Sequence, residues 1–264
     1  MSNVVKVASI QLWHNDDDSK EDRINHAEQL IDSAADSDFI LLPEIWNIGW
    51  RSFDIYRESS ETLQGETISR IAAKAKAVNA YILAGSIVER EKDSLYSTAV
   101  LLGPKGQIIA TYRKIHLFGY SGAREAELMK RGDKIAAIKT DLGVLGLSIC
   151  YDLDFPELFR KMAVTYGVEV FLLVAAWPIQ KLDIWQDLCH ARAYENQCFL
   201  ISCDSAGINR GEQYLGHSAI IDPWSTRIAS AGIYEGIVKA EIDIDEVHRI
   251  RKGVPLLQDR FFSV

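Results

Sequence analysis

Short apolar runs rich in valine and isoleucine alternate along the chain with longer stretches in which apolar and polar positions are mixed. Runs of this kind, bounded by Gly, Pro, Asn or Asp, are typical of buried β-strands. The predicted strands cover residues 4–13, 39–42, 81–88, 97–102, 107–113, 135–139, 144–150, 168–174, 198–203, 215–221, 226–230 and 237–242.

Between these strands, four segments repeat apolar residues at the spacing of one face of an α-helix. The apolar positions are Ile24, Ala27, Ile31 and Ala34; Ile68, Ile71, Ala75 and Val78; Phe155, Leu158, Phe159, Met162 and Tyr166; and Leu182, Trp185, Cys189 and Ala193. Two turns, at 103–106 and 141–143, join neighbouring strands as hairpins. The pattern predicts an α/β (α+β) fold in which two sheets pack face to face, with helices on their outer sides.

Composition adds bounds on the domain and its partners. No linker, repeat or low-complexity stretch divides the 264 residues, so we expect one domain over 1–264. With 29 Lys and Arg against 37 Asp and Glu, the net charge of −8 disfavours a nucleic-acid surface, which needs clustered cations. No apolar run is long enough to span a bilayer, and the N-terminus lacks a basic leader. We therefore expect a cytoplasmic protein without membrane or nucleic-acid partners.

The cysteines point to thiol chemistry rather than to cross-links. The four cysteines, Cys150, Cys189, Cys198 and Cys203, show no CxxC spacing and no partnered histidine spacing. A disulfide framework or a zinc site is therefore not expected. Cys150 stands out, because it ends a predicted strand where a helix begins, and unpaired N–H groups there favour an anion. We expect the other three to be inert packing residues.

Two further reactive side chains also follow predicted strands. Glu44 comes directly after Leu-Leu-Pro at 41–43, and Lys114 lies in Tyr-Arg-Lys-Ile-His-Leu-Phe at 112–118. The ends of strands are where α/β proteins assemble their sites. A thiol, a carboxylate and an ammonium together meet the needs of acyl transfer through a covalent intermediate.

These segments resemble the nitrilase superfamily of carbon–nitrogen hydrolases. The matching motifs are Leu-Leu-Pro-Glu at 41–44, Tyr-Arg-Lys-Ile-His-Leu-Phe at 112–118, Cys-Tyr-Asp-Leu-Asp-Phe-Pro-Glu at 150–157, Ala-Ala-Trp-Pro at 175–178 and Ala-Arg-Ala-Tyr-Glu-Asn-Gln at 191–197. The resemblance covers nearly the whole chain. It implies a four-layer α-β-β-α sandwich that assembles as a homodimer or a larger homo-oligomer.

The resemblance also implies a role for each reactive residue. Glu44 would be the general base, Lys114 the electrostatic partner and Cys150 the nucleophile. The family often has a second glutamate at a fixed distance before Pro-Gly-Asp, which reads Arg-Gly-Asp at 131–133 here. Counting back gives Glu125, with Glu127 as the alternative because the proline is missing.

The implied reaction is hydrolysis of a small aliphatic carboxamide to carboxylate and ammonia through a cysteine thioester, without metal or organic cofactor. A thiol flanked by Lys114 is expected to be ionised near neutral pH. Tyr151 would supply a backbone N–H to the oxyanion, and Tyr151, Trp177, Phe118 and Trp46 are expected to shape the substrate pocket. Trp50 also follows a catalytic segment.

The residues around Cys150 also bear on which branch of the family this chain resembles. Nitrile-cleaving members tend to have Cys-Trp-Glu at the nucleophile, whereas this chain has Cys-Tyr-Asp at 150–152, as amidases and ω-amidases do. Relatives that act on dicarboxylic acid monoamides commonly carry Arg where this chain has Asp154. Asp154 and Glu157 also fit a helix capping box with Pro156 in the first turn.

Other interpretations of the same residues stay open. The thioester could be attacked by an amine, which would make an acyltransferase or amide synthase, or the substrate could be an N-carbamoyl compound. A nitrilase or a non-catalytic family member fits less well. A cysteine–histidine hydrolase would use His116, His190 or His217 as its base, although His116 also fits a structural hydrogen-bonding role.

Overall fold

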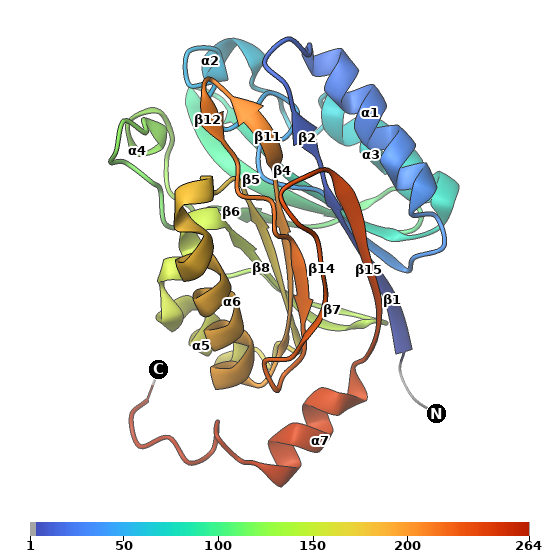
Figure 1. Cartoon of the computed structure of the whole chain (residues 1–264), viewed down its shortest axis with the longest axis vertical. Coiled ribbons are helices and arrows are strands. Elements are labelled where there is room, and N and C mark those ends of the chain that lie inside the picture. The colour runs from blue at the N-terminus through green and yellow to red at the C-terminus, as the bar shows by residue number, and fades with distance from the viewer. Residues whose placement is uncertain (1–3, 264) are drawn as a thin grey trace.

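The computed structural model describes residues 4–263 and contains two large sheets packed against each other (Figure 1). In spatial order the first sheet consists of β15 (Gly236–Asp243), β1 (Val4–Gln11), β3 (Phe39–Leu41), β4 (Tyr81–Glu91), β5 (Ser94–Leu102) and β6 (Ile108–Arg113). The second consists of β14 (Arg227–Ser230), β13 (Ala219–Ile221), β10 (Phe199–Asp204), β9 (Val170–Ala175), β8 (Gly143–Ile149) and β7 (Ala137–Thr140). A small third sheet joins β12 (Glu212–Gln213), β11 (Ala206–Asn209) and β2 (Trp13–His14).

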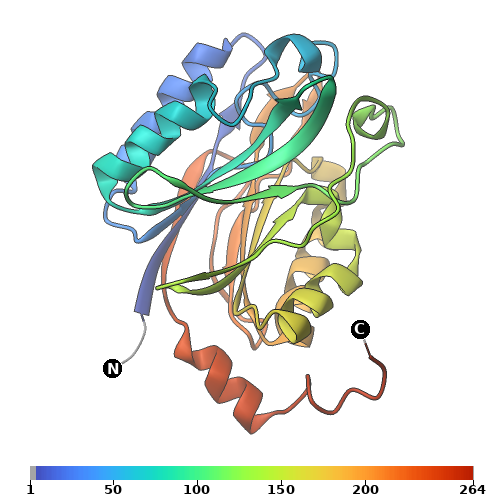
Figure 2. The same cartoon turned by 180° about the vertical axis from the view of Figure 1, so that it is seen from behind.

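Helices cover the outer faces of both large sheets, as the two opposite views show (Figures 1 and 2). Two of them, α1 (Lys20–Ser33) and α3 (Glu66–Val78), lie on the first sheet, and α5 (Pro156–Thr165) and α6 (Leu182–Asn196) lie on the second. The remaining helices are α2 (Tyr56–Ser59), α4 (Glu125–Leu128) and α7 (Asp245–Gly253), with two 3₁₀ turns, η1 (Cys150–Asp154) and η2 (Ile179–Lys181). The predicted order of helix, sheet, sheet and helix is confirmed.

The alternation of side chains along the strands explains this layering. In β1, Val5 and Val7 belong to the core between the two sheets, whereas Ala8 and Ile10 belong to the core under α1 and α3. Since successive side chains of a strand point to opposite faces, a strand covered on both sides must be apolar at nearly every position. This is why the strands appear in the sequence as continuous apolar runs.

Several predicted boundaries move. The predicted strand 4–13 divides into β1 and β2, because residues 13–14 leave the first sheet to pair with β11. The predicted strand 215–221 shortens to β13, because Gly216 and His217 both adopt left-handed backbone angles, with φ of 67° and 48°. The hairpin turns at 103–106 and 141–143 are confirmed by the antiparallel pairs β5–β6 and β7–β8.

The expected single domain of residues 1–264 includes residues 1–3 and 264, which lie outside the described range. Within residues 4–263, no helix combines the length and the apolar character needed to cross a bilayer.

Candidate active site

The three reactive side chains singled out in the sequence come together at one end of the double sheet. Glu44 follows β3 and Lys114 follows β6, both in the first sheet, whereas Cys150 follows β8 in the second. The two sheets are joined at this end, since the backbone N–H of Glu44 donates to the carbonyl of Ala175 over 3.3 Å. Strand ends of both sheets thus build one site.

Lys114 lies between two buried carboxylates. Its Nζ donates to Glu44 Oε1 over 2.8 Å and to both Glu125 oxygens over 2.9 Å. The side chains of all three residues are fully buried, with 0% exposure. Glu125 is also fixed by the backbone N–H of Phe118, which donates to its Oε2 over 2.8 Å. By contrast, Glu127 is 62% exposed and pairs with Arg124, so Glu125 is the second glutamate that reaches Lys114.

This cluster perturbs the ionisation of its members. Burial by itself lowers the pKa of Lys114, but the acidic groups of Cys150, Glu125 and Glu44 beside it raise that pKa well above its usual value. Burial raises the pKa of Glu125, with Lys114 opposing the shift and Glu44 adding to it. The carboxylates beside Lys114 therefore favour its charged form despite its burial.

Cys150 occupies a strained position where β8 ends. Its φ of 51° lies in the left-handed region, which costs a residue with a Cβ about 1–3 kcal/mol. The residue is only 5% exposed, yet it lines the pocket described below. Such strain at the junction of a strand and a helical turn aims a side chain out of the sheet, a geometry that α/β-hydrolases use at the sharp turn that carries their nucleophile.

The surroundings of Cys150 favour the thiol over the thiolate. Burial is the largest cause that raises its pKa well above the usual value, Glu44 raises it further, and Lys114 only partly offsets both. The direction is opposite to the ionised thiol expected from the sequence. Glu44 Oε2 is buried and has no hydrogen-bond partner within residues 4–263, which leaves one carboxylate oxygen free to accept a proton.

The carboxylate of Asp152 stabilises the turn that carries Cys150. It accepts hydrogen bonds from the N–H of Ile149 over 2.9 Å and from the hydroxyl of Tyr112 over 2.7 Å. His116 Nδ1 lies 2.7 Å from the same carboxylate, and its ring stacks on Phe155 with centroids 3.7 Å apart. These contacts give His116 a structural role, because they hold it against Asp152 and Phe155.

The other two histidines considered as a possible base, His190 and His217, form hydrogen bonds with residues other than Cys150. His190 Nδ1 is 2.9 Å from the carbonyl and from the hydroxyl of Ser225. The carbonyl of His217 accepts a hydrogen bond from Trp185. Among the described residues no histidine is hydrogen-bonded to Cys150, whereas Glu44 is one of the charged groups that act on its thiol.

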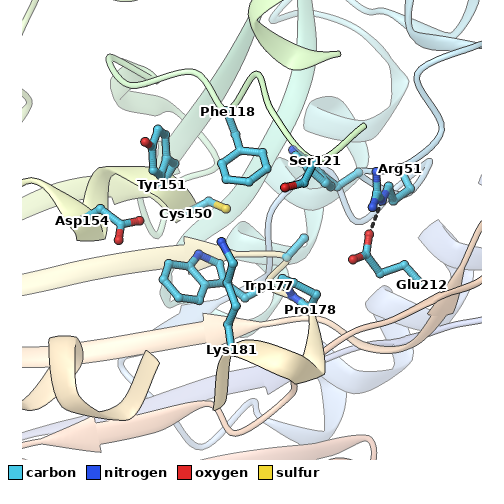
Figure 3. Close-up of a pocket in the computed structure, with 12 residues that line it drawn as sticks. Arg51, Phe118, Ser121, Cys150, Tyr151, Asp154, Trp177, Pro178, Lys181 and Glu212 are labelled. Atoms are coloured by element: carbon cyan, nitrogen blue, oxygen red, sulfur yellow. Dashed lines mark hydrogen bonds and ion pairs between the residues drawn. The ribbon is translucent and has the colours of Figure 1, made fainter. Parts of the chain in front are cut away.

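Cys150 opens into a small pocket with a cavity volume of about 70 Å³ (Figure 3). This volume is far below the ~300–1,000 Å³ of sites that hold drug-sized ligands. Three of the four residues predicted to bind substrate, Tyr151, Trp177 and Phe118, line it, together with Trp50. The pocket thus has aromatic walls around a single thiol.

Trp46, the fourth residue predicted to bind substrate, lies outside this pocket. It is 1% exposed, packs in the core under α1 and α3, and its Nε1 donates to the carbonyl of Ala84 over 2.9 Å. The reason is the preceding residue: Ile45 has a left-handed φ of 43°, which turns the chain back into the core directly after Glu44.

Charged residues in the pocket wall were not predicted from the sequence. Lys181 in η2 and the ion pair of Arg51 with Glu212 all line the pocket (Figure 3). Lys181 follows the Ala-Ala-Trp-Pro motif by only three residues, and this closeness to a pocket motif is the one signal that could have identified it. Arg51 directly follows Trp50, which is a comparable signal, whereas Glu212 lies beside no motif.

Asp154 also lines the pocket instead of capping a helix. The N-cap of α5 is Phe155, no side chain caps that end, and Asp154 belongs to η1. The predicted capping box is therefore wrong, because the 3₁₀ turn after Cys150 shifts the helix start by one residue. Asp154 is partly buried, which raises its pKa, while Lys181 and Arg192 act to lower it.

Comparison with known proteins agrees with this fold and identifies the family. A family model described as carbon-nitrogen hydrolase matches residues 6–252. The 2-oxoglutaramate amidase of Paenarthrobacter nicotinovorans is 34% identical over 262 residues, which cover 96% of this chain and 88% of that protein. The 2-oxoglutaramate amidase of Bacillus subtilis is 36% identical over 239 residues, covering 90% of this chain and 91% of that protein.

A solved structure extends the comparison to the fold. Saccharomyces cerevisiae Nit3, a member of branch 10 of the nitrilase superfamily, superposes with a TM-score of 0.88 at 28% identity, covering 98% of this chain and 97% of that one. The chain therefore belongs to the carbon–nitrogen hydrolase family of the nitrilase superfamily.

Proposed function

We propose that this amidase hydrolyses a small aliphatic carboxamide to a carboxylate and ammonia, using Cys150 as nucleophile, Glu44 as general base, and Lys114 and Glu125 as the charged support. One observation carries the proposal. A buried ammonium, Lys114, lies between two carboxylates beside a buried thiol that lines a small pocket. The family match over residues 6–252 supports the expectation of one catalytic domain.

The protonated state of Cys150 defines the first step. Because burial raises the pKa of the thiol, a base must take its proton as the sulfur attacks the carbonyl carbon. Glu44 is suited to this task, since its Oε1 is held by Lys114 and its Oε2 is free. The C–S bond forms as the carbonyl π pair moves onto oxygen. This oxyanion is stabilised by Lys114 and by the backbone N–H of Tyr151.

Donors fixed in a buried site before the reaction are each worth about 2.7–4 kcal/mol of barrier, because no water has to reorganise around the new charge. Collapse of the intermediate breaks the C–N bond, and the proton held by Glu44 passes to the leaving nitrogen. Ammonia departs and leaves a Cys150 thioester. Glu44 then removes a proton from water as its oxygen attacks the thioester carbon. The C–S bond breaks, the proton passes from Glu44 to the sulfur, and the carboxylic acid product ionises to the carboxylate in water.

The pocket argues for a short substrate. A cavity of about 70 Å³ bounded by Phe118, Tyr151 and Trp177 suits a short acyl chain. The two bacterial relatives above are named 2-oxoglutaramate amidases, and these names support a substrate in which the amide ends a short aliphatic acid. The acyl group of the thioester is taken to pass to water, and an amine is the alternative acyl acceptor.

The test is ammonia release from a panel of carboxamides, nitriles and N-carbamoyl compounds of matched chain length, with Cys150→Ala as the control. We expect the carboxamides to be turned over with the highest kcat/KM, and Cys150→Ala to release no ammonia. A preference for a nitrile or a carbamoyl compound would overturn the assignment. Added hydroxylamine separates the acceptors: a hydroxamate formed in preference to the acid at low amine concentration would indicate an acyltransferase.

A further inference from the structure

Lys181 is a cation in the pocket wall that has no part in the chemistry proposed for Cys150, Glu44, Lys114 and Glu125. It ends η2, directly before α6, and its side chain extends into the pocket that also holds Cys150 (Figure 3). Its Nζ lies 4.8 Å from the ring centroid of Phe118, 5.3 Å from that of Trp177 and 6.0 Å from that of Tyr120. Aromatic faces attract a cation and remove part of its water without neutralising its charge.

The charge of Lys181 is not cancelled by a close carboxylate. Among residues 4–263 no acidic oxygen lies within the 4.0 Å that defines an ion pair with its Nζ, whereas Arg51, the other cation of the pocket, is paired with Glu212. Asp154 lies in the same pocket and interacts with Lys181 electrostatically without forming an ion pair with it. One ammonium in the pocket is thus free to accept an anionic ligand.

We propose that Lys181 binds a carboxylate at the far end of the substrate and so selects ω-monoamides of short dicarboxylic acids over neutral amides. The inference rests on the proposed function, because the amide carbon must be held at Cys150 while the other end of the chain reaches Lys181. The aromatic rings around the Lys181 ammonium hold it in place before the substrate arrives, which reduces the entropy lost on binding.

The expected size of this effect follows from the contact. A hydrogen bond between an ammonium and a carboxylate in a partly desolvated site discriminates by roughly 10- to 100-fold against a ligand without the charge. Asp154 lies in the same pocket and repels a second negative charge. Neutralising it should therefore strengthen the binding of an anionic amide.

The experiment compares amides of equal length with and without a terminal carboxylate: the monoamides of butanedioic and pentanedioic acid against butanamide and pentanamide. We expect Lys181→Met to raise KM for the monoamides about 10- to 100-fold and to change kcat/KM for the neutral amides less than about threefold. Lys181→Arg should retain most of the preference, and Asp154→Asn should lower KM for the monoamides. Lys161→Met, which removes an exposed lysine of α5, is the matched control and should change neither substrate class.

A measurement on the unaltered protein covers the case in which Lys181→Met fails to fold. KM for the monoamides should rise with ionic strength, while KM for the neutral amides stays constant. Equal losses of both substrate classes in Lys181→Met, or a wild-type enzyme that prefers the neutral amides, would overturn the role of Lys181. The proposed function fails differently: neither class would release ammonia, or Cys150→Ala would still release it.

Discussion

The buried carboxylate of Glu125 provides the sharpest single test of the charged cluster. Glu125→Gln keeps the size of the side chain but replaces one acceptor oxygen with an N–H₂ donor. That donor would face either the Lys114 ammonium, now 2.9 Å from each oxygen, or the N–H of Phe118 at 2.8 Å. In either case two donors meet where a charged hydrogen bond existed, and Lys114 keeps only the Glu44 carboxylate and one neutral amide oxygen as acceptors.

The magnitude follows from the hydrogen bond that is lost. A hydrogen bond to a charged group contributes about 1.5–3 kcal/mol, and its loss in a buried site is not compensated by water. If this stabilisation acts on the transition state, then at about 1.4 kcal/mol for each factor of ten kcat/KM should fall roughly 10- to 150-fold. The side chain is fully buried, so solvent screening does not reduce this value.

The matched control is Glu127→Gln. Glu127 lies two residues away in the same short helix, but it is 62% exposed and pairs with Arg124 on the surface. Exposed pairs contribute about 0–1 kcal/mol, and this one is outside the pocket, so we expect less than a twofold change. The assay is steady-state ammonia release, with far-UV circular dichroism and thermal unfolding to confirm that both variants fold.

Two results would refute the reasoning. Glu125→Gln with full activity would show that Lys114 does not need its second carboxylate. Equal losses in Glu125→Gln and Glu127→Gln would show that the loop around α4 matters for its conformation and not for the buried charge.

Other positions lead to further predictions. His116→Ala should lower Tm yet keep the ammonia burst within tenfold of wild type, because His116 contacts Asp152 and not Cys150; loss of the burst would favour a histidine base. Burial raises the pKa of Asp204 well above its usual value, so the folded state binds more protons than the unfolded one and loses stability as the pH rises above about 4. Urea unfolding of Asp204→Asn should lack this decline, and parallel pH profiles would contradict it. Trp46→Ala should cost about 3–5 kcal/mol of unfolding free energy without a change in KM, since the ring fills the core; a raised KM would return Trp46 to the pocket. Sedimentation should give a dimer, because Phe261 and Phe262 are 93% and 82% exposed, and a monomer would remove the tail as a docking segment.

Much of the fold could be predicted because its signals are local. The apolar runs of β8, β9 and β10 and the periodic faces of α1, α3, α5 and α6 are properties of neighbouring residues. What the sequence could not reveal depends on distant pairing. β2 forms only because β11, nearly two hundred residues later, lies beside it. The segment of α7 is largely polar and buries only Val247 and Ile250, so its sequence resembles that of an exposed tail.

The candidate site also has some residues that local sequence signals identify and others whose position depends on distant contacts. Glu44, Lys114 and Cys150 could be identified because each lies at or just after the end of a predicted strand, and strand ends meet at one edge. The direction of a side chain after such an end is not a local property. The left-handed angle of Ile45 sends Trp46 into the core, and Lys181 enters the pocket beside the ring of Phe118, which is far from it in the sequence.

The central claim is that the reaction passes through a thioester on Cys150, and mass spectrometry of the protein quenched during turnover tests it most directly. We expect the intact mass to increase by the mass of the substrate less ammonia, the adduct to map to the peptide that contains Cys150, and Cys150→Ala to show neither adduct nor turnover. Ammonia release by Cys150→Ala, or an adduct on Cys189, Cys198 or Cys203 instead, would contradict the account.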